Sequence, residues 1–486
     1  MSYSKEQIDN LLNETENFQY VEFNKTILKE LLTNISSNLE KDLENRKIYK
    51  TNYEKYISIE EQLNDDLSIL QRLAAYPKLI LDFIELNGVE ILCKILNHPN
   101  IDIVNRSINL IQEITEGDFL NEIEDPKSFL ELFLNNNLFE LLVDNLYKIE
   151  NEISKNEDCI QYKSDILSII ENYLDIYSLS YELLGKQNKI FKWLLLTIKN
   201  DTNDIKEIEI KLFASEILNQ LLQNSDKNRI IFFKEEGLPI LINIILVEKN
   251  NFTDEKKNDS KLIEFINNIV DSICSSMLEE KNQEIFNKSD GINLFIESMK
   301  ENNIFRHLSL KILTYSLLNN KDNCIKFIEN NGLSLIFSYY MGKGLKKFDN
   351  KKIKKGEENV LEIISNLIQF CNGIYLERLI NKFAENKYEK IKRLVNYYIE
   401  FHNGDDEEQK YIFQQLSIIT LYLIHIKNNK NQNLIKYNKI SDKLVLRLSN
   451  EKIENMKMNI SKIIEENEKE NEEESEYLKF LKNLIL

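Results

Sequence analysis

A short motif recurs along this chain: an asparagine, a phenylalanine four residues later, a glycine five residues after that, and then apolar residues. Complete copies are Asn228–Phe232–Gly237, Asn282–Phe286–Gly291 and Asn323–Phe327–Gly332, and a partial copy, Phe83–Gly88, lacks the asparagine. Self-similarity at a period of tens of residues is the signature of repeat arrays, in which each unit packs only against its neighbours. The sequence therefore predicts a solenoid, a fold whose function depends on what its stacked surface binds.

The glycine positions set the length of the expected repeat. The array consists of Gly88, Gly237, Gly291, Gly332 and Gly373, with Asn137 and Lys189 in the glycine's place in two degenerate copies. The resulting spacings of about 41 to 54 residues begin within the range of HEAT and armadillo repeats, and the longer copies require polar insertions. Glycine (11 residues) and proline (4) are scarce, which favours an all-α fold with long helices.

Each repeat is expected to contain three helices. The Asn–Phe segment forms a short first helix, which the glycine ends by adopting the left-handed backbone conformation that other residues avoid. The apolar run after the glycine is a second, buried helix. A longer amphipathic third helix follows, predicted over Asp102–Thr115, Tyr162–Leu174, Lys206–Leu222, Leu262–Met277, Phe305–Leu318 and Glu357–Cys371. Three helices per repeat indicate about six or seven units of an armadillo-type α-solenoid rather than two-helix HEAT repeats.

Segments of different character flank the array. Residues 1–57 are charged and irregular except for one weakly amphipathic helix around Ile27–Leu43, and we interpret them as a leader with an N-terminal capping helix. We expect the repeat array over residues 58–400 and a C-terminal helical capping domain over 401–486. This last domain should contain a long helix over Gln409–Ile426 and an apolar final helix over Tyr477–Leu486, which seals the end of the array. Between them, the acidic run Glu465–Glu476 is interpreted as solvent-exposed chain.

Composition narrows the class of function. A net charge of −18 disfavours nucleic-acid binding, which depends on clustered Lys and Arg, and favours basic protein partners. The five cysteines are dispersed without a Cys-x-x-Cys pair, and the four histidines are isolated, so no metal, cofactor or disulfide framework is predicted. No catalytic motif is present, and we expect a non-enzymatic protein. The N-terminal residues lack an apolar signal-peptide core and no apolar run reaches membrane-spanning length, so we expect an intracellular protein.

Several longer strings resemble a known family. They are Asn381–Asn386 with Glu389–Lys390 and Arg393–Leu394; Ser215–Leu218 with Leu221–Asn224; Phe83–Gly88 with His98–Asn100; Asp271–Ser275; and Asp322–Cys324 with Lys326–Phe327. Each string alone is weakly specific, but together they run in order and in register from about residue 60 to 485. In these segments the chain resembles the beta-catenin-like protein 1 family.

The resemblance implies a nuclear, non-enzymatic armadillo scaffold associated with the spliceosome through its nineteen complex. It further implies that the protein binds basic, nuclear-localisation-like segments of splicing factors, including the Myb-like subunit of that complex, without direct contact to nucleic acid or membrane. Residues 1–57 lack the basic, bipartite-type import signal that the family usually carries near its N-terminus. Two alternatives stay open: a cytoplasmic armadillo adaptor for trafficking, cytoskeletal or chaperone partners, and a docking subunit of an enzyme. Whether the protein forms a homodimer also stays open.

The third helices of an armadillo array line its concave face, where a partner peptide would lie. Aligning them on Ile364–Leu367, which matches the family's Leu-x-Asn-Leu step, places six residues at equivalent positions: Glu113, Asn172, Gln220, Ser272, Tyr315 and Asn366. Such a row would present side-chain acceptors to an extended peptide, while acidic neighbours attract its Lys and Arg side chains. The alternative is that these are polar residues on exposed helix faces. The single tryptophan, Trp193, is predicted to be a core residue of a second helix, which disfavours a general import receptor with a Trp–Asn array.

One dense basic cluster stands out against the acidic background. Lys351, Lys352, Lys354 and Lys355 follow Lys346–Lys347 in a Gly-rich insertion ahead of a long helix. The cluster is a candidate import signal or nucleic-acid contact. The alternative is a solvated loop in a lysine-rich chain, because such short motifs often match by chance.

Overall fold

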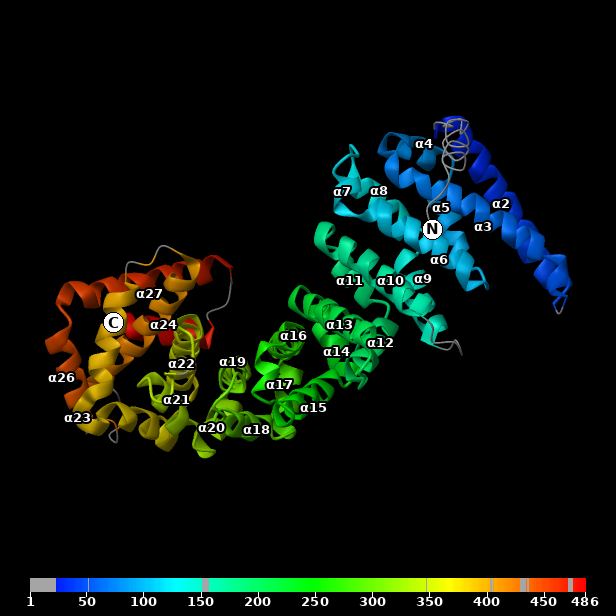
Figure 1. The fold of residues 1–486 in the computed structure, drawn as a ribbon. Helices are drawn as coiled ribbons and strands as arrows, with labels where there is room; N and C mark the ends of the chain where they lie inside the picture. The colour runs from blue at the N-terminus through cyan, green and yellow to red at the C-terminus, as the bar shows by residue number, and fades with distance from the viewer. Residues whose placement is uncertain are drawn as a thin grey trace, which may run out of the picture. The chain divides into compact units, whose positions relative to one another are not determined.

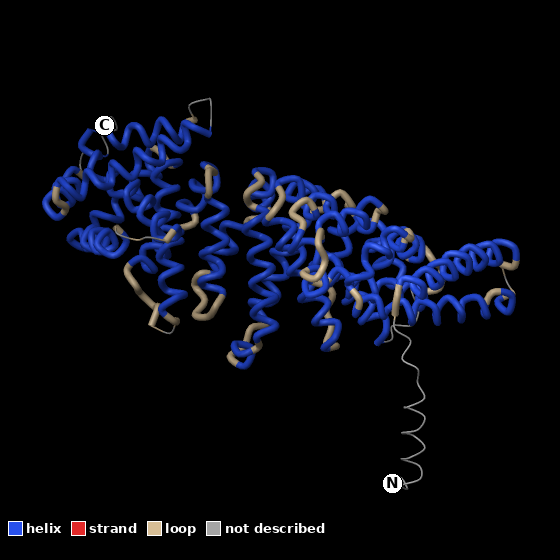
Figure 2. Tube along the Cα trace, turned by 90° about the horizontal axis from the view of Figure 1, so that it is seen from above, coloured by secondary structure: helices blue, strands red, loops and turns tan. Residues whose placement is uncertain are grey.

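The computed structural model describes residues 23–50, 52–150, 157–346, 348–402, 404, 406–428, 434, 437–470 and 475–486. These residues form helices joined by loops, with no β-strand among them (Figure 2). Residues 1–22 of the predicted leader and Lys347 lie outside the described residues. No helix in the described part is long and apolar enough to cross a membrane. The prediction of an all-α, armadillo-type solenoid is confirmed.

The chain divides into two compact units, an N-terminal unit (Met1–Asn228) and a C-terminal unit (Arg229–Leu486). The predicted boundaries at residues 57 and 400 separate the repeat array from its caps. The division into compact units does not test them, so they stay predictions.

The N-terminal unit consists of a helical hairpin followed by three-helix repeats (Figure 1). The hairpin helices are α2 (Lys25–Ile48) and α3 (Ile57–Leu70), with the 3-10 turns η1 (Tyr53–Lys55), η2 (Gln71–Ala75) and η3 (Pro77–Leu79) beside them. The first repeat contains α4 (Ile80–Glu85), α5 (Gly88–Ile95) and α6 (Ile101–Thr115), and the short α7 (Gly117–Leu120) follows it. The next repeats are α8 (Pro126–Asn135), α9 (Leu138–Glu150) and α10 (Glu157–Ile176), then α11 (Ser180–Gly185), α12 (Lys189–Lys199) and α13 (Ile205–Gln223).

Packing within this unit follows the expected order. The third helices α6, α10 and α13 lie side by side (Figure 1), and the hairpin covers the open side of the first repeat through contacts of α3 with α6 and of α2 with α5. Leu28, Leu32 and Ile35 of α2 are fully or almost fully buried, and α2 extends beyond the predicted helix Ile27–Leu43 at both ends. Its role as a cap of the array stays a prediction. Trp193 of α12 is buried in the core, as predicted.

Helix α14 (Asp226–Lys234) spans the boundary, and the C-terminal unit continues the three-helix pattern. Its helices are α15 (Gly237–Asn250), α16 (Ser260–Ser276) after the turn η4 (Glu255–Asn258), α17 (Glu280–Lys288), α18 (Gly291–Ser298), α19 (Phe305–Leu317), α20 (Lys321–Glu329), α21 (Gly332–Tyr340), α22 (Asn350–Phe370), α23 (Gly373–Phe401) and α24 (Glu407–Ile424). The turn η5 (His425–Asn428), α26 (Asn438–Arg447), α27 (Asn450–Glu470) and α28 (Glu476–Ile485) complete it.

In this unit the third helices α16, α19 and α22 again contact one another in succession, and α24 packs on α22. Helices α26, α27 and α28 all contact α24. Leu478, Leu481 and Leu484 of α28 are buried, because its apolar residues recur at helical spacing and share one face. The predicted apolar final helix is therefore present and packs on α24 and α27, while its role in sealing the array stays a prediction.

The glycine of the repeat motif has a different role from the predicted one. Gly237 does not adopt the left-handed conformation. It is the first residue of α15, and a Cβ there would lie 2.1 Å from the ring of Phe232. The preceding residue is left-handed instead, and this holds for Asn87, Glu236, Asp290 and Asn331, which precede the glycines of the four copies. The Phe–Gly spacing is thus a packing requirement: the phenylalanine ring occupies the space that a side chain would need.

The asparagine of the motif is a buried hydrogen-bond donor that closes the end of the preceding third helix. Asn323 donates from Nδ2 to the carbonyl oxygen of Ser316 at 2.7 Å, and Asn282 donates likewise to Ser276 at 3.0 Å. Asn282 also reaches the carbonyl oxygen of Arg229, 53 residues earlier, at 3.3 Å. Since the last carbonyls of a helix lack intrahelical partners, this amide satisfies one of them and joins successive repeats.

Two of the predicted repeat markers are misplaced. Asn137 has a φ of 61° and precedes Leu138, the first residue of α9, so it corresponds to the left-handed residue and not to the glycine. Gly373 begins α23 directly after the third helix α22, whereas the backbone turns away from helical geometry at Glu385–Tyr388 inside α23. The turn between the first two helices of this last repeat therefore lies at Glu385–Tyr388 and carries no glycine. The 41-residue spacing from Gly332 to Gly373 thus did not mark the equivalent turn. Lys189 begins α12, as expected.

Candidate functional site

In the N-terminal unit, the predicted binding residues lie on the third helices. Glu113 of α6 is exposed, and Asn172 of α10 and Gln220 of α13 are partly exposed. The Asn172 amide donates to Thr115 Oγ1 on the neighbouring α6 at 3.4 Å. These three residues therefore come from adjacent helices of one packed row, with part of each side chain accessible to solvent.

Carboxylates dominate this surface. We call the set Glu113, Glu116, Asp165, Glu171, Asp175 and Glu216 the acidic face. Partial burial raises the pKa of the Glu113 carboxyl, and the negative charges of Glu116 and Asp165 raise it further. The pKa of Glu171 is raised in the same way, by burial and then by Glu216 and Asp175. Because these carboxylates repel one another, an incoming cation would relieve the repulsion.

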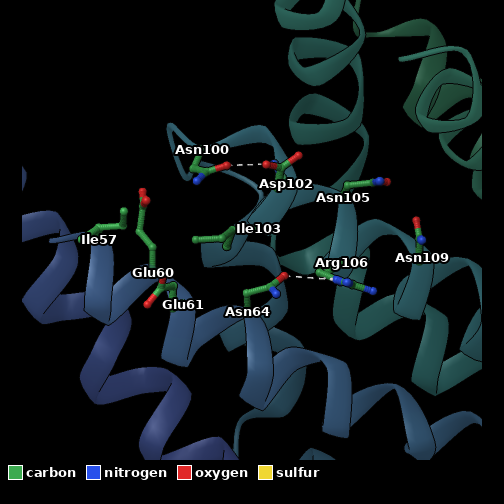
Figure 3. A pocket seen from close by; sticks show the side chains of 10 residues that line it. All are labelled: Ile57, Glu60, Glu61, Asn64, Asn100, Asp102, Ile103, Asn105, Arg106 and Asn109. Carbon is green, nitrogen blue, oxygen red and sulfur yellow. Dashed lines mark hydrogen bonds between the residues drawn. The ribbon is translucent and has the colours of Figure 1, made fainter. Parts of the chain in front are cut away.

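A polar hollow of about 550 Å³ adjoins this face where α3 and α6 meet (Figure 3). Four asparagines line it: Asn64, Asn100, Asn105 and Asn109. Arg106 Nε donates to Asn64 Oδ1 at 3.2 Å. With its nitrogen turned toward the surrounding acceptors, the Asn109 amide donates to Asp165 Oδ2 of α10 at 2.9 Å. Carboxamides offer both donors and acceptors, which suits them to the backbone of an extended peptide.

In the C-terminal unit, only some of the predicted binding residues on the third helices are accessible to solvent. Tyr315 of α19 is partly exposed, but Ser272 of α16 is fully buried, so its predicted place on the surface is wrong. One residue along a helix rotates the side chain by about 100°, and Ser272 shares the inward face with Ile269. Asp271 takes the exposed position, and its Oδ1 lies 2.5 Å from Lys311 Nζ.

The last predicted residue of the row, Asn366 of α22, is only 6% exposed. Its Nδ2 donates to the carbonyl oxygen of Glu362 at 3.1 Å. It lies at the edge of a hollow of about 600 Å³ to which α24 and α28 contribute, through residues such as Gln414 and Tyr477. The final helix therefore covers part of the third-helix face at this end of the C-terminal unit.

The basic cluster is helical and not a loop. Lys351, Lys352, Lys354 and Lys355 belong to the first turns of α22, and all four are exposed. The Asp349 side chain caps the helix by accepting from the Lys352 backbone N–H at 2.9 Å, and this cap explains why a lysine-rich segment starts a helix here.

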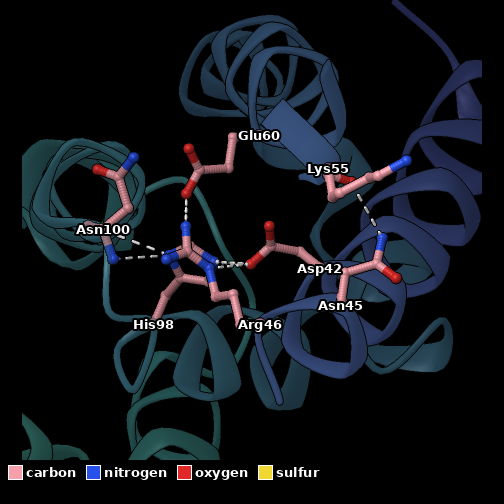
Figure 4. Close-up of polar contacts among 7 residues, drawn as sticks. All are labelled: Asp42, Asn45, Arg46, Lys55, Glu60, His98 and Asn100. Atoms are coloured by element: carbon pink, nitrogen blue, oxygen red, sulfur yellow. Dashed lines mark hydrogen bonds and ion pairs between the residues drawn. The ribbon is translucent and has the colours of Figure 1, made fainter. Parts of the chain in front are cut away.

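Sequence reasoning missed a buried charged cluster that holds the capping helix in place (Figure 4). His98 lies in the loop between α5 and α6, where it is buried, and its Nε2 donates to Asp42 Oδ2 of α2 at 2.8 Å. The Asn100 backbone N–H donates to His98 Nδ1 at 3.1 Å, which places the ring proton on Nε2. Arg46 of α2 donates from Nε to Asp42 at 2.6 Å and is ion-paired with Glu60 of α3.

This cluster has the donor types of a metal site, but a cation already occupies it. Ligand atoms of Asp42, Glu60 and His98 lie within 4.8 Å of one another. The Arg46 guanidinium contacts both carboxylates, so a metal ion would have to displace it. Burial raises the pKa of Asp42, but hydrogen bonds from His98 and Arg46 outweigh burial and lower it overall. The arrangement serves as a structural tie between α2, α3 and the first repeat; Asp42 and His98 are 56 residues apart, so no local spacing could reveal it.

Comparisons with known proteins agree with the geometry. The family model described as catenin-beta-like, Arm-motif containing nuclear matches residues 6–434. The chain is 30% identical to beta-catenin-like protein 1 of Homo sapiens over 385 residues, which make up 77% of this chain and 65% of the human protein. It is 27% identical to the beta-catenin-like protein 1 homolog of Schizosaccharomyces pombe over 401 residues, 80% of this chain and 67% of that protein.

Solved structures show the same fold at low sequence identity. The SYS-1 protein in its complex with POP-1 matches with a TM-score of 0.54 and 11% identity, over 94% of this chain and 81% of that one. An engineered protein matches with a TM-score of 0.52 and 11% identity, over 95% and 98% of the two chains.

Proposed function

The chain belongs to the family of catenin-beta-like, Arm-motif containing nuclear proteins, and from this premise we propose that it is a non-enzymatic nuclear scaffold that binds basic segments of other proteins. The proposed partners are splicing factors, including the Myb-like subunit of the nineteen complex. The observation that carries the proposal is the acidic face of the N-terminal unit, a set of neighbouring carboxylates in which the pKa values of Glu113 and Glu171 are raised by burial and further by adjacent negative charges. A Lys- or Arg-rich peptide would neutralise charges that the folded chain leaves in mutual repulsion.

In the proposed complex, the peptide lies in extended form across α6, α10 and α13. Glu113 and its acidic neighbours attract the cationic side chains, while amides such as Asn172 and Gln220 bond the peptide backbone. In the C-terminal unit, Tyr315 and Asn366 remain proposed contact residues, and Asp271 replaces Ser272 because it is partly exposed where its neighbour Ser272 is buried.

The test is binding of a labelled Lys- and Arg-rich peptide to the full chain, followed by fluorescence anisotropy. The double variant Glu113→Gln/Glu171→Gln removes two charges from the acidic face without changing side-chain size. We expect about a tenfold rise in Kd, equivalent to ~1.4 kcal/mol. The matched control, Glu90→Gln/Glu140→Gln, removes two charges from the second helices α5 and α9, and an equal loss of affinity in the control would refute a localised site.

The cellular part of the proposal is tested separately by affinity purification of the tagged protein from nuclear and cytoplasmic extracts. Splicing-complex subunits in the nuclear fraction are the expected result. Recovery of trafficking, cytoskeletal or chaperone proteins from the cytoplasmic fraction alone would favour a cytoplasmic adaptor instead.

A further inference from the structure

Another hollow, lined by lysines and so opposite in charge to the acidic face, lies on the third helices of the C-terminal unit. It measures about 210 Å³ and is formed by α16, α19 and α22. Its lining includes three apolar residues, Ile263, Ile304 and Leu308, which we call the floor, and three lysines, Lys311, Lys352 and Lys355, which we call the rim. We call it the lysine-rimmed hollow. It lies wholly within one unit and contains two lysines of the basic cluster, whose function the proposed binding of basic peptides does not explain.

The floor can accept one apolar side chain. An apolar cavity of about 150 Å³ is enough to hold benzene, so this hollow admits a leucine or phenylalanine side chain. Gly356 also lines the hollow, and a Cβ at this position would lie 1.9 Å from Tyr339 Oη of α21. The lack of a side chain at Gly356 lets α21 and α22 approach closely.

The rim can accept an anion. Lys355 is paired with Glu358 at 3.0 Å, Lys352 with Asp349 at 3.6 Å, and Lys311 with Asp271 at 2.5 Å. In the Lys352–Asp349 pair both side chains are more than half exposed, and exposed pairs contribute little stability, so a competing carboxylate can replace Asp349 at small cost. Glu358 is only 9% exposed, so Lys355 keeps this partner and adds to the attraction from the rim while it stays paired. His307, which also lines the hollow, adds no charge at neutral pH, because burial and the nearby Arg306 lower its pKa to about 4.

We propose that the lysine-rimmed hollow binds an acidic peptide segment that inserts one large apolar side chain between α16, α19 and α22. The apolar floor takes the anchor, the lysines pair with flanking Asp or Glu, and Asn267 and Asn359 on the lining offer amides to the peptide backbone. An apolar floor argues against a nucleic-acid backbone, and so does the net charge of −18, because both give phosphates little to bind. The partner is therefore opposite in charge to the one proposed for the acidic face.

The experiment uses the full chain and a labelled synthetic peptide, Glu-Glu-Asp-Leu-Phe-Asp-Glu-Glu, in a fluorescence anisotropy titration. We expect saturable binding that Lys352→Glu/Lys355→Glu weakens by about tenfold or more. The control Lys288→Glu/Lys300→Glu makes the same charge change at exposed residues of the same unit outside the hollow, and should weaken binding by less than about twofold. A peptide with Ser-Ser in place of Leu-Phe keeps every charge and tests the floor without altering the protein; we expect about a tenfold loss.

Three results would overturn the proposal. One is the absence of saturable binding by the wild-type chain. Another is equal weakening by the hollow and control variants, which would mean diffuse attraction. The third is binding of a single-stranded RNA oligonucleotide, but not the acidic peptide, through Lys352 and Lys355. Failure here leaves the basic-peptide proposal intact, because that site is probed with a cationic peptide and with variants in the other unit.

Discussion

The two units present the same row of third helices but differ in what those helices expose. In the N-terminal unit, α6, α10 and α13 carry neighbouring carboxylates, and the pKa values of Glu113 and Glu171 are raised mainly by burial and further by the negative charges beside them. In the C-terminal unit, Asp271 is paired with Lys311, and the start of α22 adds four exposed lysines. A shared backbone architecture thus carries surfaces of opposite charge, which means that partner choice is a property of side chains and not of the fold.

The units also differ in how their ends are closed. Both α2 and α28 are attached through a buried apolar face, but the N-terminal unit adds buried ion pairs and a histidine to α2. The loss of a buried leucine leaves a cavity, whereas the loss of one member of the charged cluster leaves an unpaired buried charge.

The largest effect is expected from Arg46→Met, which removes the only charge that contacts both Asp42 and Glu60 in the described cluster. Breaking a buried pair from one side typically costs about 3–5 kcal/mol. Trp193, the single tryptophan, is buried in the N-terminal unit, so its fluorescence reports on that unit during urea unfolding. A matched change in the C-terminal cap, Leu481→Ala, should move the helical ellipticity but leave the tryptophan transition in place. An unchanged tryptophan transition in Arg46→Met would contradict the structural role of the cluster.

The next effect tests what the units share, the contact between the motif's phenylalanine and glycine. Gly88→Ala in the N-terminal unit and Gly237→Ala in the C-terminal unit place a Cβ at 2.2 Å and 2.1 Å from the preceding ring. Overpacking of this kind costs about 1–3 kcal/mol, so both melting temperatures should fall. Gly117→Ala is the control, because nothing lies within 4 Å of its added Cβ. If Gly237→Ala melts like Gly117→Ala, the close contact is not what requires glycine.

The sequence predicted the bounds of the helices well, but it predicted less well which face of a helix each residue occupies. Third helices such as Leu262–Met277 fall within two residues of the observed Ser260–Ser276, because hydrophobic periodicity depends only on local sequence. The face that each residue presents depends on register, and Ser272 was misplaced because an error of one residue turns a side chain by about 100°. The glycine was predicted correctly for the wrong reason, because a left-handed turn and a close aromatic contact both select glycine at a helix junction.

Contacts between residues far apart in the chain could not be predicted from the sequence. Asp42, Glu60 and His98 meet only when the hairpin folds onto the first repeat, so neither their spacing nor their residue types singled them out. The sequence revealed only one part of the lysine-rimmed hollow. The basic cluster around Lys352 was identified from its lysines. The apolar floor could not be, because it comes from α16 and α19, which precede Lys352 by several tens of residues.

A smaller effect should appear on acidification and should be specific to the N-terminal unit. The pKa of Asp42 is lowered in the folded state from an ordinary value of 3.8. Its contribution to stability is therefore complete above pH ~3.8 and is lost as pH falls through the lower, folded-state pKa. We expect the stability difference between wild type and Asp42→Asn, measured through Trp193 fluorescence, to be largest near neutral pH and to shrink below pH ~4. A difference that is constant from neutral pH to pH ~3 would show that the carboxylate charge is not what stabilises α2.

The smallest effect distinguishes two adjacent residues of α16 and fixes the register of the third-helix face. Ser272 is fully buried and its hydroxyl makes no hydrogen bond in the described structure, so Ser272→Ala should be neutral or stabilising by a few tenths of a kcal/mol. Asp271→Ala removes a partly exposed pair with Lys311 and should cost no more than about 1 kcal/mol.

The same two variants should differ in their affinity for the acidic peptide. Asp271→Ala frees Lys311 on the rim of the hollow and should strengthen binding of the acidic peptide, whereas Ser272→Ala should leave it unchanged. The opposite pattern would mean that Ser272 faces the partner, as the sequence alignment of the helices predicted, and that the face assigned to α16 is wrong.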